Sequence, residues 1–138
     1  MMSKVRILVI EDEPGVSMMI VYLMTRAGVD VQAALTGKKG MELAQEDRFD
    51  LIVLDVDLPD LDGFEIYSEL KQRHLTCNTP IVFVSASATI EDQQRALELG
   101  VADFIEKPFN AQDFVSRTLS HVEFKNGPIE EISESSMA

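Results

Sequence analysis

Three short runs of mainly aliphatic residues, at residues 4–10, 50–55 and 80–85, stand out along the chain. The apolar positions within each run are nearly continuous and do not alternate with polar ones. That pattern is typical of strands that are covered on both faces of a parallel sheet. Residues 29–33 and 102–105 show the same tendency more weakly. We therefore expect three central strands and two outer strands.

The segment after the first run has the pattern of a helix. Its apolar residues recur at helical spacing and form one stripe, made of Val16, Met19, Ile20, Leu23 and Ala27. Such a stripe is the face that a surface helix turns toward the core. We expect these five side chains to pack against the sheet.

Residues that favour helix starts precede three further segments, and residues 36–46 form another helix candidate. Asp62, Thr89 and Asn110 each carry a side-chain oxygen that can accept from the backbone N–H groups of a first helical turn. The helix after Thr89 has polar residues at positions 93–95, where an apolar stripe would continue. We expect this helix to pack loosely, which suits a segment that shifts when the protein is activated.

The alternation of five strands with five helices predicts an α/β fold, in which a parallel sheet carries helices on both faces. Residues 126–138 contain Gly, Pro, three Glu and three Ser, with little to bury. We expect residues 1–125 to form one domain, and residues 126–138 to form a flexible tail or the start of a linker.

Composition narrows the class of protein. The chain has 138 residues, of which 46% are apolar, and this suffices for one globular core. Its single cysteine cannot form an internal disulfide, which suits a reducing compartment and a cytoplasmic location. We expect no membrane attachment, since the chain lacks a signal-peptide pattern and any apolar run of the ~18–20 residues that a membrane span needs. The net charge of −12 argues against nucleic-acid binding by this chain, because it would repel phosphate backbones.

Much of the acid lies where the predicted strands end. Seven of the 24 acidic residues fall in residues 11–13 and 55–62, and neither stretch contains a lysine or an arginine. Ligands of open α/β sheets bind at the carboxyl ends of the strands, so we expect Glu11, Asp12 and Asp55 to meet there. Carboxylates at such close range raise one another's pKa unless a cation joins them. Mg²⁺ is the hard ion that a few carboxylates suit best.

Four motifs in order make the sequence resemble the receiver domain of two-component response regulators over about residues 4–123. They are Val9-Ile10-Glu11-Asp12, Asp55-Val-Asp-Leu-Pro-Asp-Leu-Asp-Gly63, Val84-Ser85-Ala86 and Lys107-Pro108-Phe109. The resemblance implies a flavodoxin-like, doubly wound sheet of five parallel strands in the order 2-1-3-4-5, with five helices. This fold agrees with the pattern of strands and helices described above.

The resemblance also implies a role for each residue at the predicted strand ends. Asp55 would accept a phosphoryl group from a phosphohistidine. Glu11, Asp12, Asp55 and the backbone carbonyl of Asp57 would hold Mg²⁺ or Mn²⁺. Lys107 would pair with Asp55 in the empty site and with a phosphoryl oxygen afterwards. Glu11 stands where Asp is more frequent in this family, so its longer side chain changes the geometry around the metal.

Two further residues would couple the site to a surface. By the resemblance, Ser85 donates its hydroxyl to a phosphoryl oxygen, and Phe104 is the aromatic residue that turns inward when the Ser85 loop moves. Asp57 and Ser87 match positions that tune the lifetime of the phosphoryl group in this family. Such a protein is a switch that catalyses its own phosphorylation and slow dephosphorylation, and it is not a conventional turnover enzyme.

The implied partners are a sensor histidine kinase or a histidine phosphotransfer protein, and a downstream effector protein or domain. Met18 and Tyr22 lie opposite the apolar stripe of the first helix, and we expect these exposed side chains to contact the kinase. No pair of DNA-binding helices is visible in the sequence, so the receiver acts alone or belongs to a larger regulator or hybrid kinase. A homodimer is a further alternative, although Ala102 stands where one dimerising subfamily has an acidic residue.

Two other functions fit parts of the sequence. A phosphatase of the haloacid-dehalogenase type also places a nucleophilic Asp after a strand, as in Asp55-Val56-Asp57, but Pro59 stands where its motif has Thr or Val. A pseudo-receiver would keep the fold without phosphorylation, and the intact acidic residues and Lys107 argue against it. Gly37-Lys-Lys-Gly40 is neither a dinucleotide-binding motif nor a P-loop.

Overall fold

The computed structural model describes residues 4–122 and has the predicted α/β architecture. Five parallel strands pair in the order β2-β1-β3-β4-β5. The strands are β1 (Arg6–Ile10), β2 (Asp30–Ala34), β3 (Leu51–Asp55), β4 (Ile81–Ser85) and β5 (Asp103–Glu106). The helices are α1 (Pro14–Arg26), α2 (Gly37–Glu46), α3 (Gly63–Lys71), α4 (Ile90–Leu99) and α5 (Ala111–Leu119). The predicted fold is therefore confirmed. The predicted tail, residues 126–138, lies outside the described residues.

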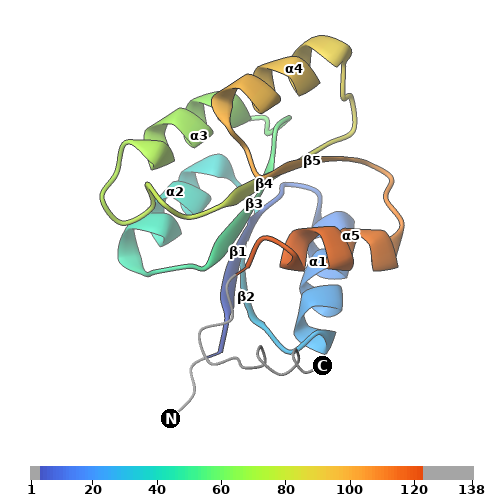
Figure 1. The fold of residues 1–138 in the computed structure, drawn as a ribbon. Coiled ribbons are helices and arrows are strands. Elements are labelled where there is room, and N and C mark those ends of the chain that lie inside the picture. The colour runs from blue at the N-terminus through green and yellow to red at the C-terminus, as the bar shows by residue number, and fades with distance from the viewer. Residues whose placement is uncertain (1–3, 123–138) are drawn as a thin grey trace, which may run out of the picture.

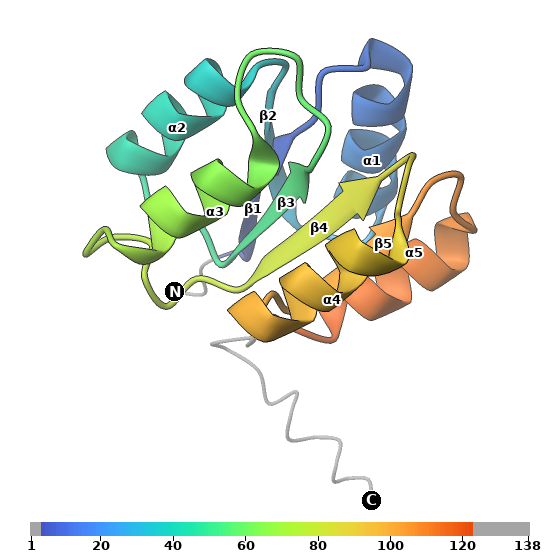
Figure 2. The same cartoon turned by 90° about the horizontal axis from the view of Figure 1, so that it is seen from above.

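The helices divide between the two faces of the sheet (Figures 1 and 2). Helices α2, α3 and α4 cover one face, and α1 and α5 cover the other. Each face has its own cluster of buried apolar side chains. The central strands β3 and β4 are buried at every position, because both of their faces are covered, and this explains their nearly continuous apolar sequences.

The predicted helix caps are confirmed. The side chains of Asp62, Thr89 and Asn110 accept from backbone N–H groups in the first turns of α3, α4 and α5. Thr36 caps α2 in the same way, through the N–H of Lys39. Each cap satisfies an N–H group that has no partner within its own helix.

The predicted inward face of α1 needs a correction. Met19 is 41% exposed and Ala27 lies beyond the helix, whereas Ser17 and Met24 are buried beside Ile20. Nearly every residue of 16–24 is apolar, so the sequence does not determine which side of the helix faces the sheet. The contacts of Met24 with the core on that face of the sheet decide the rotation of the helix.

Helix α4 packs loosely, as predicted from its polar residues. Ala96 is its one buried residue, while Ile90 and Leu97 are 76% and 78% exposed. A helix with so little buried apolar surface is weakly attached to the sheet. It therefore suits a segment that moves.

Two glycines allow helices to approach the strands that lead to the carboxylate cluster. A Cβ at Gly40 in α2 would lie 2.5 Å from Ile10 at the end of β1. A Cβ at Gly63, where α3 begins, would lie 2.6 Å from Cα of Val56 and 2.9 Å from the carbonyl oxygen of Asp55. Gly63 therefore fits where a side chain would collide with the backbone that carries Asp55.

Candidate functional site

Three carboxylates meet where the central strands β1 and β3 end. Asp55 is the last residue of β3, and Glu11 directly follows β1, which pairs with β3 through Ile10 and Leu54. One ligand oxygen from each of Glu11, Asp12 and Asp55 lies within 4.8 Å of the others. Glu11 is fully buried and Asp55 is 2% exposed. The expectation that these three residues converge is confirmed.

Lys107 supplies the positive charge at this cluster. Its ammonium nitrogen lies 2.9 Å from Oε1 of Glu11 and 3.4 Å from Oδ2 of Asp55. The backbone N–H of Lys107 donates to the carbonyl of Ser85, which holds the loop after β5 against the end of β4. The resemblance implied a pair between Lys107 and Asp55. The structure contains that pair and adds a closer contact with Glu11.

Burial and charge shift the pKa of Asp55 strongly. Burial raises the pKa of its carboxyl group from 3.8 to about 7, and the negative charge of Glu11 adds to the increase. The hydrogen bond from the N–H of Asp57 and the charge of Lys107 oppose this increase. For Lys107, burial lowers the pKa, but its hydrogen bond to Glu11 and the charge of Asp55 outweigh burial and raise it overall. The site therefore favours a cation beside Asp55 whenever that carboxylate is ionised.

The donor set fits a hard divalent cation. Three carboxylates lie beside one ammonium group, and two of them, Glu11 and Asp55, are buried from water. Mg²⁺ and Mn²⁺ prefer oxygen ligands of this kind. Within residues 4–122, this is the one group of three or more His, Cys, Asp or Glu side chains with ligand atoms close enough to share an ion.

Asp57 connects the end of β3 to the loop that follows β4. Its backbone N–H donates to Oδ1 of Asp55 over 2.8 Å, which orients the buried carboxylate. Its own carboxylate accepts from the hydroxyl of Ser85 over 2.8 Å and from that of Ser87 over 3.5 Å. The resemblance implied a role for the backbone carbonyl of Asp57 as a metal ligand. It did not predict that the side chain of Asp57 binds the serines.

Ser85 is fully buried at the end of β4, as the strand pattern implied. Its hydroxyl oxygen also accepts from the N–H of Ser87 over 3.1 Å. These hydrogen bonds join the end of β4 to Asp57 and to Ser87 in the loop between β4 and α4. The structure thus brings Ser85 to the predicted edge of the sheet, where its hydroxyl donates to Asp57.

Phe104 lies in β5, directly across from Phe83 in β4. The two rings meet edge to face with their centroids 6.1 Å apart, and Phe104 is half-buried. Arg117 in α5 donates to the backbone carbonyl of Phe104 and forms two hydrogen bonds with Asp103. These contacts join β5 to α5, and no pattern in the sequence indicated them.

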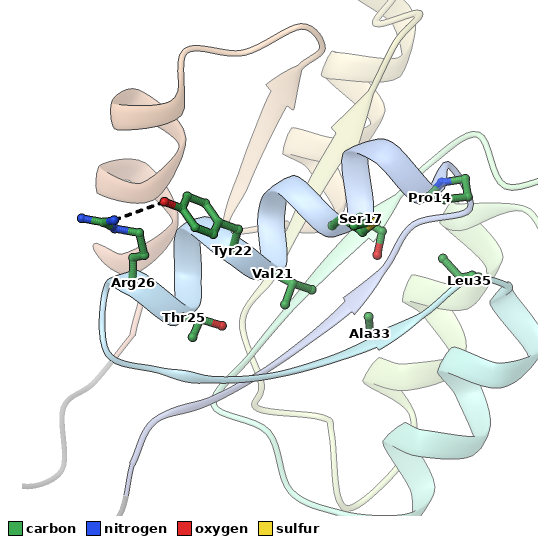
Figure 3. A pocket seen from close by; sticks show the side chains of 9 residues that line it. Pro14, Ser17, Val21, Tyr22, Thr25, Arg26, Ala33 and Leu35 are labelled. Atoms are coloured by element: carbon green, nitrogen blue, oxygen red, sulfur yellow. Dashed lines mark hydrogen bonds between the residues drawn. The ribbon is translucent and has the colours of Figure 1, made fainter.

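An apolar hollow of about 740 Å³ lies beside α1 (Figure 3). Val21 and Thr25 of α1 face Ala33 of β2 and Leu35 across it. Tyr22 and Met18, which also line the hollow, are 57% and 71% exposed, as their positions on the helix predicted. The hollow presents apolar surface beside Met18 and Tyr22, the two residues predicted to contact a partner.

Comparisons with known proteins agree on one family. The family model described as the response regulator receiver domain matches residues 7–119. The chain is 36% identical over 112 residues to the DNA-binding dual master transcriptional regulator RpaA of Synechocystis sp.. That match covers 81% of this chain and 46% of RpaA. The chain thus spans about half the length of the curated relatives that it matches.

Solved structures show the same fold. The chemotaxis protein CheY4 of Vibrio cholerae is 27% identical, with a TM-score of 0.81 over 88% of this chain and all of that one. The receiver domain of the sensor histidine kinase PA1611 of Pseudomonas aeruginosa is 26% identical, with a TM-score of 0.77 over 86% of this chain and 97% of that one. The latter structure has a magnesium ion coordinated in its active site cleft. Among residues 4–122, no helix has both the length and the apolar character that crossing a membrane requires.

Proposed function

The chain belongs to the response regulator receiver domain family of two-component signal transduction, and we propose that its Asp55 is a Mg²⁺-dependent acceptor of phosphoryl groups. The observation that carries this proposal is the cluster of Glu11, Asp12 and Asp55 with Lys107. Of these three carboxylates, only Asp55 belongs to a central strand, which it ends. Its side chain also accepts a hydrogen bond from the N–H of Asp57, which orients it.

In the proposed reaction, a carboxylate oxygen of Asp55 attacks the phosphorus of a phosphohistidine in line with the leaving nitrogen. The new O–P bond forms as the P–N bond breaks, and the electron pair of that bond stays on the imidazole. Phosphoryl transfer needs positioning and charge neutralisation more than proton transfer. Asp55 meets these needs because its carboxylate is fixed by Asp57 and faces the charge of Lys107.

A magnesium or manganese ion would be held by Glu11, Asp12, Asp55 and the backbone carbonyl of Asp57. When bound, it supplies the charge neutralisation that three carboxylates and an incoming phosphoryl group require. Lys107 then pairs with a phosphoryl oxygen, and Glu11 keeps the ammonium group in reach from the side of β1. Ser85 donates its hydroxyl to another phosphoryl oxygen, which draws the loop after β4 inward.

We propose that this movement passes to Phe104 and α4. Phe83 lies two residues before Ser85 and contacts the Phe104 ring. The exposed Ile90 and Leu97 of α4 provide an apolar surface for an effector. Such an effector is attached to the receiver or separate from it, and a second copy of the chain is a further candidate. The protein is a switch that promotes its own phosphorylation and slow dephosphorylation, not a turnover enzyme.

The proposed phosphoryl donor is a sensor histidine kinase or a histidine phosphotransfer protein in the cytoplasm. It would dock on the exposed side of α1, where Met18 and Tyr22 line the apolar hollow. We propose residues 1–125 as the receiver unit and residues 126–138 as a tail or linker. Charge complementarity to nucleic acid is lacking, since the chain carries a net charge of −12.

Labelling with a small phosphoryl donor tests the acceptor function without a kinase. The purified chain is incubated with acetyl phosphate and Mg²⁺, and its intact mass is measured. We expect an increase by the mass of one phosphoryl group, and we expect none when EDTA removes the metal. A chain that gains no phosphoryl group with Mg²⁺ present would contradict the proposed function and favour a pseudo-receiver.

A further inference from the structure

The Asp57 carboxylate joins the loops that follow β3 and β4. Its Oδ2 accepts from the hydroxyl of Ser85 over 2.8 Å. The hydroxyl of Ser87 lies 3.5 Å from the same oxygen, and the N–H of Ser87 donates back to the oxygen of Ser85 over 3.1 Å. One oxygen of Asp57 therefore contacts the hydroxyls of Ser85 and Ser87, and Ser85 in turn accepts from the N–H of Ser87.

The Ser85 hydroxyl cannot donate to Asp57 and to a phosphoryl oxygen at the same time. A serine has a single O–H proton, so it donates one hydrogen bond at a time. When Ser85 donates to Asp57, that proton does not serve a phosphoryl oxygen on Asp55. Hydrogen bonds to ionised carboxylates are shorter and stronger than those to neutral acceptors. The Asp57 carboxylate therefore competes with a phosphoryl oxygen on Asp55 for the hydroxyl of Ser85.

The surroundings of the two partners differ in a way that suits release. Ser85 is fully buried and fixed by its strand, whereas Asp57 is exposed. After the hydroxyl turns away, the Asp57 carboxylate is hydrated at once, so no buried charge is left unpaired. Breaking this hydrogen bond therefore costs Asp57 little free energy.

We propose that the Asp57 carboxylate is a latch, a positioning residue that holds Ser85 and Ser87 in the resting loop until a phosphoryl group on Asp55 takes the hydroxyl. The inference rests on the proposed phosphoacceptor function and assigns a regulatory role within that site. The latch lowers the resting population of the switched loop, because the protein must lose one charge-assisted hydrogen bond to adopt that state.

The charge of Asp57 has a second effect, which the test must separate from the latch. A carboxylate on this edge of the sheet repels any incoming phosphoryl group, whether or not it binds Ser85. Glu13 offers the matched control. It is an exposed acid next to the cluster, and none of the hydrogen bonds found in residues 4–122 joins its side chain to Ser85.

The experiment is a double-mutant cycle on binding of beryllofluoride, a phosphoryl mimic, in the presence of Mg²⁺. Dissociation constants are measured by amide NMR titration for the wild type, Asp57→Ala, Ser85→Ala and the double variant. We expect Asp57→Ala to tighten binding about fivefold more in the wild-type background than in the Ser85→Ala background. Only the wild-type background has a Ser85 hydroxyl, and Asp57→Ala frees that hydroxyl from its resting hydrogen bond. Glu13→Gln should change the affinity equally in both backgrounds.

Ser85→Thr provides a conservative check, because threonine keeps the hydroxyl. In that background, Asp57→Ala should again tighten binding about fivefold more than in the Ser85→Ala background. Equal effects of Asp57→Ala in the wild-type and Ser85→Ala backgrounds, within about twofold, would overturn the latch. Failure of the wild type to bind Mg²⁺ and beryllofluoride would instead overturn the phosphoacceptor function itself. The two failures are therefore distinguishable.

Discussion

The ammonium group of Lys107 lies closer to Glu11 than to Asp55, at 2.9 Å against 3.4 Å. The other carboxylate oxygen of Glu11 accepts from the N–H of Glu13, so hydrogen bonds hold both oxygens of this side chain. The longer side chain of Glu, where the family more often has Asp, reaches across to the lysine. As a result, Asp55 shares its counter-charge with Glu11. Burial is the main cause that raises the pKa of Asp55 to about 7, and the negative charge of Glu11 adds to it.

Replacing Lys107 should therefore raise the pKa of Asp55 further and destabilise the fold. Lys107→Ala leaves two buried carboxylates without their ammonium partner. Breaking a fully buried pair costs about 3–5 kcal/mol, and we expect about 1–3 kcal/mol here because Asp55 can take up a proton. Urea unfolding gives the free energy, and NMR titration of the side-chain carboxyl carbon gives the pKa. Lys39→Ala, at an exposed position on α2, is the matched control. An unchanged Asp55 titration in Lys107→Ala would contradict the assigned contact.

Asp55→Asn should stabilise the metal-free protein at high pH. In the wild type the pKa of Asp55 is 3.8 when unfolded and about 7 when folded. Between these values the folded state binds the extra proton, so stability falls as the pH rises and levels off above about 7. Asn cannot ionise, so the variant escapes this loss, which we expect to be on the order of 2–4 kcal/mol.

Urea unfolding with EDTA at pH 5 and pH 8 measures this difference. The gain of Asp55→Asn over the wild type should be larger at pH 8. Added Mg²⁺ should reduce the gain by stabilising the wild type. A gain that is the same at both pH values would contradict the raised pKa of Asp55 in the folded state.

Gly63→Ala should destabilise the protein and disturb Asp55. The new Cβ would lie 2.6 Å from Cα of Val56 and 2.9 Å from the carbonyl oxygen of Asp55. Backbone atoms cannot relieve such a clash by changing rotamer, as a side chain can. We expect a loss of about 1–3 kcal/mol by thermal or urea unfolding, together with slower labelling by acetyl phosphate. Gly15→Ala is the control, since nothing lies within 4 Å of its Cβ. It should be neutral or stabilising by up to about 1 kcal/mol, because Ala is the better helix former. Equal stabilities for the two variants would refute the close approach of α3.

Met18→Ala and Tyr22→Ala should slow phosphotransfer from a histidine kinase without changing labelling by acetyl phosphate. Both side chains are exposed on α1 and line the apolar hollow, whereas the small donor needs only the cluster at the strand ends. From a panel of purified kinases, the fastest donor is used, and we expect its transfer rate to fall about tenfold. Ile90→Ala, which removes an equally exposed apolar side chain from α4, should leave the rate unchanged. A similar loss in all three variants would argue against α1 as the docking face.

Sequence patterns predicted the parts of this molecule that depend on local chemistry. The caps Asp62, Thr89 and Asn110 were predictable because each acts on N–H groups within its own first turn. The convergence of Glu11 and Asp55 was predictable because strand ends in a parallel sheet meet at one edge. The resemblance to the receiver family added the roles of these residues, and the family comparison agrees with it.

Features that depend on rotamers or on packing between distant segments were not predictable. The face of α1 was misassigned at Met19, because an almost wholly apolar helix leaves its rotation to the surrounding core. The contact between Lys107 and Glu11 joins residues 96 positions apart, and its length depends on the reach of a Glu side chain. The bond between Ser85 and Asp57 depends on two loops from neighbouring strands. No pattern in either loop indicates which partner the serine chooses.

Mapping the phosphoryl group to a residue tests the central claim most directly. After labelling with acetyl phosphate and Mg²⁺, reduction with borohydride converts an aspartyl phosphate to homoserine, which peptide mass spectrometry locates. The account predicts homoserine in place of Asp55 in the wild type, and no modification in Asp55→Asn or in wild type treated with EDTA. Homoserine at another acidic position in the wild type, or a phosphoryl group that persists in Asp55→Asn, would contradict it.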